Sequence, residues 1–591
     1  MKKFQMSLYV TLGAAIVFSL FSIHFAADVS ILAFPVSAVG VGFAIYFLYF
    51  KVFKSASYKS YIPALKLLQY LPYILLLSFI LRRAGAKGTY YWYDVVTVLL
   101  WCVSLVGRWV LLYQFNEKRV LKTFPQWERE RQKSNKGTSL IVKPAGSKRI
   151  VFEIFDWIDA LVQAVFMVLL IQIFIFQLYV IPSESMVPFF LVKDRVVVSK
   201  ITSGPKFPLS DVGLPKMKRY RRGDIIVFRN PHYSLDRKSE VRTVVSQIVY
   251  MLSFTTVNLN TDEKGEIKAD PLVKRICGVP GEQLLMQDGT LYGRTAKSDE
   301  FAPIEMDKKY AAWNLNTVPP SIKRGIELIP LSQGQYDMML EVEEMRRNLD
   351  ISSVALECRS IAENVRHLCA SSAKTVGKGG AGGETDFSLY EYTVFANNRE
   401  MAEKVMSSQN SLEWFYSFMT SWIEKSTQAQ ADVQSDMYAQ ANYRLNLMIK
   451  LCAGRIIGRN IELLKQGKSA ADFENDTQLE ESLSLAEKLH FYVMILDQRN
   501  MPVFPANDEG GNPQYIPDGC YFMMGDNRFN SLDMRHSYAQ WEAPLTKYDD
   551  YSVTYYSNMS PQYVNQKYIL GSAFYRFWPL SRHGVISRGE K

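Results

Sequence analysis

A chain of 591 residues is too long for one hydrophobic core, which predicts a membrane part and at least two soluble parts. Its net charge is +10 and 48% of its residues are hydrophobic, but the long uncharged runs lie mostly in the first 181 residues. Many basic residues flank those runs, as expected if they lie in cytoplasmic loops next to membrane spans. The sequence has no RNA- or DNA-binding signature. We therefore expect no nucleic-acid partner.

Five apolar runs are each close to the about 20 residues that a bilayer core requires. They predict spans at Ser7–Phe25, Ile31–Phe50, Tyr61–Leu81, Tyr91–Leu112 and Ala160–Ile181. The first run could instead be a cleaved signal peptide, since lysines precede it and Ala26-Ala27 follow it. Few charges lie inside the first four runs, which favours an anchor over a transport or sensor function.

The loop charges predict the orientation of these spans. Ten lysines and arginines lie between residues 115 and 159, so this segment should be cytoplasmic and everything after Ile181 should lie outside. The loop with Arg82, Arg83 and Lys87 would also be outside, which goes against the rule.

After the fifth run, short β-branched runs such as Arg195–Val198 and Ile225–Phe228 predict strands. Residues Gln283–Tyr292 predict a hairpin with an Asp-Gly turn. Apolar residues at helical spacing over Val241–Leu252 predict a helix, which either packs on the sheet or lies on the membrane surface.

Strand patterns vanish between about Leu331 and Gln498, where helical periodicity takes over. Four helices are predicted, at 333–372, 398–428, 430–466 and 474–496, and the glycine-rich piece 377–383 separates the first two. Strand patterns return at Tyr521–Met524 and Tyr568–Trp578, so the helices should form a domain inserted at an exposed loop.

The sequence contains a candidate nucleophilic serine and a candidate lysine base, and it indicates no metal site. Ser185 directly follows the fifth apolar run, but none of the six histidines stands in a triad context, and no G-x-S-x-G elbow is present. A lysine can act as the base instead if burial lowers its pKa, and Lys274 follows the apolar pair Leu272-Val273. No cysteine lies in a C-x-x-C pair, so free thiols are favoured over a zinc site.

Four stretches in order resemble the sequence boxes of bacterial type I signal peptidases, the leader peptidases with a Ser-Lys pair. They are Ile181–Pro188, Arg222–Phe228, Val273–Glu282 and Met524–Arg535. The resemblance implies that Ser185 is the nucleophile and Lys274 the general base. It implies that Ser183 joins the oxyanion hole and that Ser531 orients the lysine.

Further roles follow from the same resemblance. Four residues would brace the site by ion pairs, although they could equally serve the fold alone: Arg275, Asp526, Asp533 and Arg535. Five would line the substrate pockets: Ile181, Pro182, Met186, Leu272 and Val273. Departures from the family pattern include Phe189-Phe190, Lys193 in place of glycine, and Glu282, Phe529 and Cys277, and the phenylalanines put the substrate preference in doubt.

The predicted fold is a multi-span α-helical anchor followed by a mainly antiparallel β catalytic domain with a large α-helical insertion. The implied function is removal of signal peptides after small residues, of the Ala-X-Ala type, at the outer face of the bacterial cytoplasmic membrane, without metal or cofactor. Expected partners are preprotein signal peptides, the lipid bilayer and the secretion machinery. The alternative is a catalytically silent scaffold whose helical insertion binds partner proteins.

These expectations divide the chain into six parts. They are a four-span region (1–114), a basic cytoplasmic segment (115–159), a fifth span (160–181), the first part of the catalytic domain (182–330), the helical insertion (331–498) and the second catalytic part (499–591).

Overall fold

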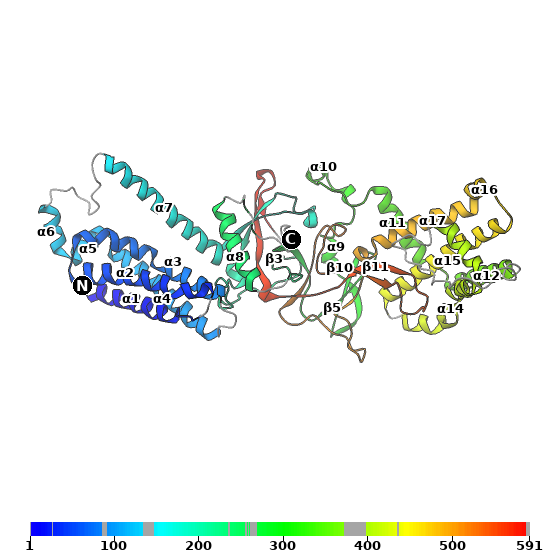
Figure 1. The fold of residues 1–591 in the computed structure, drawn as a ribbon, viewed down its shortest axis with the longest axis horizontal. Helices are drawn as coiled ribbons and strands as arrows, with labels where there is room; N and C mark the ends of the chain where they lie inside the picture. The colour runs from blue at the N-terminus through cyan, green and yellow to red at the C-terminus, as the bar shows by residue number, and fades with distance from the viewer. Residues whose placement is uncertain are drawn as a thin grey trace.

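A computed structural model describes residues 2–25, 28–85, 91–133, 147–233, 237–253, 257, 259, 269–370, 397–433 and 436–586. Three regions follow one another along the long axis of the molecule (Figure 1). Helices α1 to α7 lie at one end, the β sheets lie in the middle with α8, and helices α11 to α18 lie at the other end. The expected Ala26-Ala27 cleavage site, Lys87 and the glycine-rich piece 377–383 lie outside the described residues.

Five helical segments among the described residues are long and apolar enough to cross a membrane by length and composition: Lys2–Phe21, Val29–Lys54, Tyr58–Gly85, Tyr91–Gln114 and Arg149–Phe174. They contain α1 (Lys2–Phe21), α2 (Ala33–Ala44) with the π-helical turns Ile45–Lys54, α3 (Tyr61–Gly85), α4 (Tyr91–Gln114) and α7 (Ser147–Phe174). Two short helices, α5 (Glu117–Thr123) and α6 (Pro125–Lys133), follow α4. Helix α1 packs its apolar side chains into the shared core of this region, including Leu8, Leu12 and Phe18.

The prediction for the fifth span was wrong at its C-terminal end. Helix α7 ends at Phe174, and residues Phe176–Val180 form strand β1 instead of continuing the helix to Ile181. This strand pairs antiparallel with β2 (Arg195–Ser199), from Phe176 opposite Ser199 to Val180 opposite Arg195. A continuous apolar run does not distinguish a helix from a buried strand, and here the partner strand decides.

Polar contacts join the N-terminal helices to the β domain. Arg82 of α3 donates to Asp94 of α4 at 2.6 Å, and Ser210 donates to the other oxygen of Asp94 at 2.7 Å. Arg83 donates to the carbonyl oxygen of Leu209 at 2.8 Å. Both arginines are buried and share the carboxylate of Asp94, which lies 3.4 Å from Arg83, so one of the two positive charges that broke the loop-charge pattern is balanced inside the structure.

Antiparallel strands build the central domain. The larger sheet has the order β1-β2-β13-β3-β4-β9-β12, with β14 beside β13, and the smaller sheet has the order β7-β6-β5-β8. The remaining bounds are β3 (Ile225–Phe228), β4 (Leu272–Gly278), β5 (Glu282–Gln287), β6 (Thr290–Thr295), β7 (Ser298–Pro303), β8 (Met501–Phe504), β9 (Cys520–Met524), β10 (His536–Pro544), β11 (Thr554–Met559), β12 (Val564–Asn565), β13 (Ile569–Trp578) and β14 (Gly584–Val585).

The predicted hairpin is confirmed by β5 and β6. Asp288 and Gly289 form its turn with φ angles of 50° and 74°, as a two-residue turn between antiparallel strands requires. The predicted helix at Val241–Leu252 is part of α8 (Arg237–Leu252). Strands β10 and β11 pair with each other and extend toward the distal helices.

The distal helices lie between β7 and β8 in the chain. They are α11 (Gln333–Arg347), α12 (Ile351–Ala370), α13 (Asn398–Ser407), α14 (Gln409–Val433), α15 (Met437–Lys465), α16 (Ala470–Glu474), α17 (Thr477–Met494) and α18 (Leu496–Arg499), after the short turns α9 (Glu305–Lys308) and α10 (Pro320–Lys323). The predictions of single continuous helices at 333–372 and 398–428 were wrong. The structure interrupts the first near Asp350 and the second at Ser408. The Asp350 side chain accepts from Ser352 and Ser353 and thereby caps the start of α12.

A buried ion pair holds α15 against the segment that follows β10. Lys450 lies 2.5 Å from Asp549, both side chains are fully buried, and Lys450 also donates to the carbonyl oxygen of Phe418 at 2.8 Å. Removing one partner of such a pair leaves a buried charge without its counter-charge.

We therefore expect Asp549→Ala to lower the free energy of unfolding of the distal helices by about 3–5 kcal/mol. Urea unfolding of the purified chain, followed by the fluorescence of Trp414 and Trp422 on α14, measures this change. Glu487→Ala, at an exposed position of α17, is the control and should change the free energy by less than about 0.5 kcal/mol. Equal effects of the two variants would contradict the assignment.

Candidate active site

Ser185 lies in a short 3-10 turn, Glu184–Met186, just after β1. The backbone of Ile181 donates to Asp194, which ties the preceding segment to the start of β2. Ser185 is half-buried and Ser183 is exposed, and their hydroxyl oxygens lie 3.4 Å apart. Two hydroxyl groups therefore share one accessible surface at the junction of α7 and the β domain.

The turn that carries Ser185 is held from both sides. The backbone N–H of Asn527 donates to the carbonyl oxygen of Ser185 at 3.1 Å, and the Asn527 side chain donates to that of Glu184 at 3.1 Å. The buried carboxylate of Glu184 accepts from the backbone N–H groups of Glu327 and Leu328. These bonds fix the backbone on both sides of the serine, as a preorganised nucleophile requires.

Lys274 projects from β4 into the interior of the domain and is only 3% exposed. Its ammonium nitrogen donates to the Ser531 hydroxyl at 3.1 Å. Burial lowers the pKa of Lys274 from 10.5 to about 8, and the attraction of Asp533 offsets only part of that effect. About a tenth of this lysine is therefore uncharged at pH 7, far more than of an ordinary lysine, and this form can accept a proton.

Gly525 is where the lysine and serine segments meet. A Cβ at this position would collide with the Ser531 hydroxyl and with the carbonyl oxygen of Ser185. Ser531, which accepts from Lys274, therefore lies directly beside the turn that carries Ser185. The absence of a side chain at Gly525 permits this close approach.

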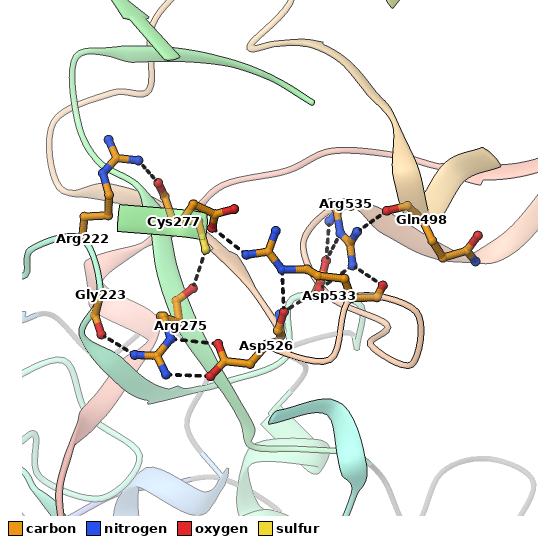
Figure 2. A network of polar contacts seen from close by, with 11 residues as sticks. Arg222, Gly223, Arg275, Cys277, Gln498, Asp526, Asp533 and Arg535 are labelled. Carbon is orange, nitrogen blue, oxygen red and sulfur yellow. Dashed lines mark hydrogen bonds and ion pairs between the residues drawn. The ribbon is translucent and has the colours of Figure 1, made fainter. Parts of the chain in front are cut away.

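Arginine–carboxylate pairs lie close together around the Gly525 loop (Figure 2), whereas Lys274 forms no ion pair among the described residues and bonds to the Ser531 hydroxyl. Arg275 donates to both carboxylate oxygens of Asp526, at 2.8 and 2.6 Å. Arg535 pairs with Asp533 in the same two-pronged way, and Asp533 also accepts from the backbone N–H of Gly525 at 2.8 Å.

The four predicted bracing residues thus form two buried pairs around the Gly525 loop. Although burial alone would raise the pKa of Asp533, the Arg535 guanidinium holds it well below its usual range, so this carboxylate stays charged. Removing either member of a pair would affect both the fold and the position of Lys274.

The five predicted pocket residues occupy different environments. Ile181 and Met186 are buried in a core cluster with Phe190, whereas Pro182 is exposed. Leu272 and Val273 are half-buried on the first half of β4. This half of β4 pairs only with β3, since β9 begins pairing at Arg275, so one edge is without a strand partner among the described residues.

Sequence reasoning missed several residues that position the site. No role was predicted for Glu184 or Asn527, which hold the Ser185 turn, or for Arg528, which pairs with Asp307 at 2.5 Å and donates to the carbonyl oxygen of Gly525 at 3.0 Å. Glu184 could have been noticed in the sequence, because it is an acidic residue between two serines just after an apolar run. The partners of Arg528 lie too far along the chain for any local pattern to identify them.

No group of three or more histidines, cysteines or acidic residues that could hold a metal ion occurs within the described ranges. All six cysteines are free: Cys102, Cys277, Cys358, Cys369, Cys452 and Cys520. Burial raises the pKa of the Cys277 thiol, which lies close behind the lysine on β4, so it stays protonated.

Comparison with known proteins places this geometry in a family context. The family model described as "Signal peptidase, peptidase S26" matches residues 154–344 and 463–578. The unmatched stretch between them lies within the distal helices. Signal peptidase I of Haemophilus influenzae is 26% identical over 270 residues, which cover 45% of this chain and 70% of that protein.

Two further relatives match shorter stretches. Signal peptidase I of Buchnera aphidicola subsp. Schizaphis graminum is 34% identical over 107 residues, 18% of this chain and 34% of that protein. Signal peptidase I of Pseudomonas aeruginosa is 31% identical over 127 residues, 21% of this chain and 42% of that protein. The chain thus spans less than half the length of these two relatives, and no solved structure gave a significant match.

The burial of Lys274 makes a prediction that does not depend on activity. Lowering a lysine pKa from 10.5 to about 8 costs about 3 kcal/mol of stability at pH 7, because the folded state disfavours a proton that the unfolded state binds. Lys274→Met removes this cost together with one hydrogen bond, so it should stabilise the folded protein by about 2 kcal/mol at pH 7.

The wild-type protein should gain stability as the pH rises from about 8 to 10.5, because the unfolded lysine is protonated in this window while the folded one is neutral. Lys274→Met should lose this dependence. Thermal unfolding in detergent over this pH range measures both effects, with the exposed Lys547→Met as control. A Lys274→Met protein less stable than wild type at pH 7 would contradict a strained, buried lysine.

Proposed function

Since the chain belongs to the signal peptidase family, peptidase S26, whose members are serine endopeptidases, we propose that it removes N-terminal signal peptides from preproteins with a Ser185–Lys274 pair. The observation that carries this proposal is the buried Lys274, bonded to Ser531 beside the backbone of Ser185. A protein with only a structural role has no need of a buried lysine with a lowered pKa whose hydrogen-bond partner lies beside the turn of an accessible serine.

The proposed mechanism assigns one task to each group. Lys274 takes the proton of the Ser185 hydroxyl, and the hydroxyl oxygen attacks the carbonyl carbon of the scissile bond. The Ser183 hydroxyl stabilises the oxyanion together with the backbone N–H of Ser185. The protonated Lys274 then gives its proton to the leaving amine, and water hydrolyses the acyl-enzyme with the lysine again acting as base.

We further propose that the substrate binds as an extended strand along the free edge of β4 at Leu272 and Val273. Main-chain groups at such an edge are available to bond an added strand, as in other forms of strand addition. Pro182 and Val273 are accessible there, whereas Ile181 and Met186 lie in the core behind them. We propose cleavage after small residues such as Ala-X-Ala, as the resemblance of the sequence boxes implies.

The membrane arrangement is proposed to be five spans with the catalytic domain on the outer face of the cytoplasmic membrane. The basic segment before α7 supports this orientation. Arg82 and Arg83 are buried and share the carboxylate of Asp94, so they are not exposed loop cations of the kind that set orientation, which weakens the objection that the loop-charge pattern raises. The secretion machinery would be a neighbour at this face.

The distal helices are proposed to be an insertion in the catalytic domain. Helices α11 to α18 connect β7 and β8, which are both strands of the smaller sheet. The chain therefore leaves and re-enters the same sheet on either side of these helices, as is expected of an inserted domain. Its partner is not defined by the site and is not needed for the proposed chemistry.

Ser185→Ala and Lys274→Ala should each lower kcat/KM for a preprotein by about 10⁴-fold or more, since each residue is indispensable to nucleophilic attack. Cleavage of a preprotein by the purified full-length chain in detergent, with product mass determination, measures this. Lys547→Ala should cleave normally. Undiminished cleavage by Lys274→Ala would show that another group is the base.

Activity should rise with pH through about 8 and then level off, because only the uncharged form of Lys274 can accept the serine proton. A kcat/KM profile between pH 6 and 10 tests this. Ser531→Ala should shift the ascending limb of the profile, since the lysine loses its bonding partner, whereas a serine of purely structural importance would lower kcat/KM equally at all pH values. A profile flat below pH 8 would contradict Lys274 as base.

A further inference from the structure

A cavity of about 680 Å³ lies between the N-terminal helices and the β domain, away from Ser185 and Lys274. Helices α3 and α7 form one part of its wall, and α8, the segment 200–216 and residues near the start of β13 form the rest. In Figure 1, α7 runs toward α8 at this boundary. The cavity thus lies where helices of membrane-spanning length meet the extramembrane domain.

The two parts of the wall differ in chemistry. The α3 and α7 part is apolar, with Leu76, Leu77, Ile80, Val165, Leu169 and Ile173. Tyr73 of α3 stacks on Phe166 of α7, with ring centroids 4.5 Å apart, and joins the two helices within this wall. An apolar wall built from candidate spanning helices is suited to an acyl chain.

The rest of the lining carries an excess of positive charge, with Arg83 at the C-terminal end of α3 and with Lys200, Lys206, Lys216, Arg229 and Arg237. The acidic residues of the lining are fewer, namely Asp211, Glu240 and Asp270. Asp211 pairs with Lys206 at 2.6 Å, and Glu240 pairs with Arg237 at 3.0 Å. Lys200 and Lys216 form no ion pair within the part of the chain that the structure describes, so positive charge is left over.

One buried group points to a ligand independently of this count. Arg83 is only 7% exposed, and its Nη1 atom has no hydrogen-bond partner among the described residues. Arg83 lines the cavity and shares the single carboxylate of Asp94 with Arg82, so one of these two positive charges lacks a counter-charge, which an anion in the cavity would supply. Lys200 is held near the same space, where burial and Arg229 lower its pKa, a cost that a bound anion would also offset.

We propose that this cavity binds one anionic phospholipid of the leaflet next to the β domain, with its phosphate at Arg83 and Lys200 and its acyl chains against α3 and α7. A signal peptide is a poorer occupant, because its apolar segment would leave the positive charges of the wall without a counter-charge. A free phosphate would use the cations but leave the apolar wall uncovered. The site would make the seating of the β domain on the helices depend on lipid charge.

The test titrates the full-length protein in detergent with short-chain phosphatidylglycerol, short-chain phosphatidylcholine or inorganic phosphate, and follows the thermal unfolding midpoint. Phosphatidylglycerol should raise the midpoint at concentrations where phosphatidylcholine and inorganic phosphate do not. Equal effects of the two lipids would overturn the proposal, and an equal effect of inorganic phosphate would identify a free-anion site instead.

Variants locate the effect. Lys200→Gln should weaken the apparent affinity for phosphatidylglycerol by about fivefold, the typical contribution of one basic residue to an anionic lipid contact. Arg83→Gln should weaken this affinity as well, provided that the variant folds. If it does not fold, Lys200→Gln alone decides the test. The exposed and distant Lys547→Gln should leave the affinity unchanged. Unchanged affinity in Lys200→Gln would overturn the assignment of the phosphate position.

Discussion

The burial of Lys274, which lowers its pKa, is the constraint on which the catalytic domain depends. Lys274 lies on β4 between β3 and β9, and burial makes its charged form unfavourable. The cationic neighbours Arg275 and Arg535 each have a carboxylate partner, so their charges are compensated while the lysine has only the Ser531 hydroxyl. The two ion pairs thus permit a dense polar site without supplying Lys274 with a counter-charge of its own.

The same site depends on segments that come from distant parts of the chain. The turn with Ser185 follows α7, Lys274 lies about ninety residues later, and the Gly525 loop comes after the distal helices. Asn527 joins the last of these to the first through the carbonyl oxygens of Glu184 and Ser185. A large helical segment can lie between the strands without disturbing the site, because β7 and β8 belong to the smaller sheet and not to the one that holds Lys274.

Much of the fold was predictable where local patterns decide structure. The Asp288-Gly289 hairpin and the strands at Ile225–Phe228 and Tyr521–Met524 follow from turn residues and β-branched runs. The end of the fifth span was not predictable, because the run through Phe176–Val180 is apolar in either conformation and only its pairing with β2 makes it a strand.

For the site, the ordered boxes indicated the serine, the lysine and their neighbours, and Lys193 illustrates why some family positions favour glycine. Its φ of 70° lies in the left-handed region, which a side chain makes costly. Glu184 and Arg528 could not be assigned, since their partners are backbone groups near residue 327 and a carboxylate at Asp307. Such contacts exist only after the chain has folded.

The most direct test of the central claim is covalent labelling by a signal-peptide analogue with an electrophilic phosphonate at the scissile position. We predict that mass mapping places the label on Ser185, that the labelling rate rises with pH through about 8, and that folded Lys274→Met protein is not labelled. Label on another residue, or labelling of Lys274→Met at the wild-type rate, would contradict the Ser185–Lys274 pair.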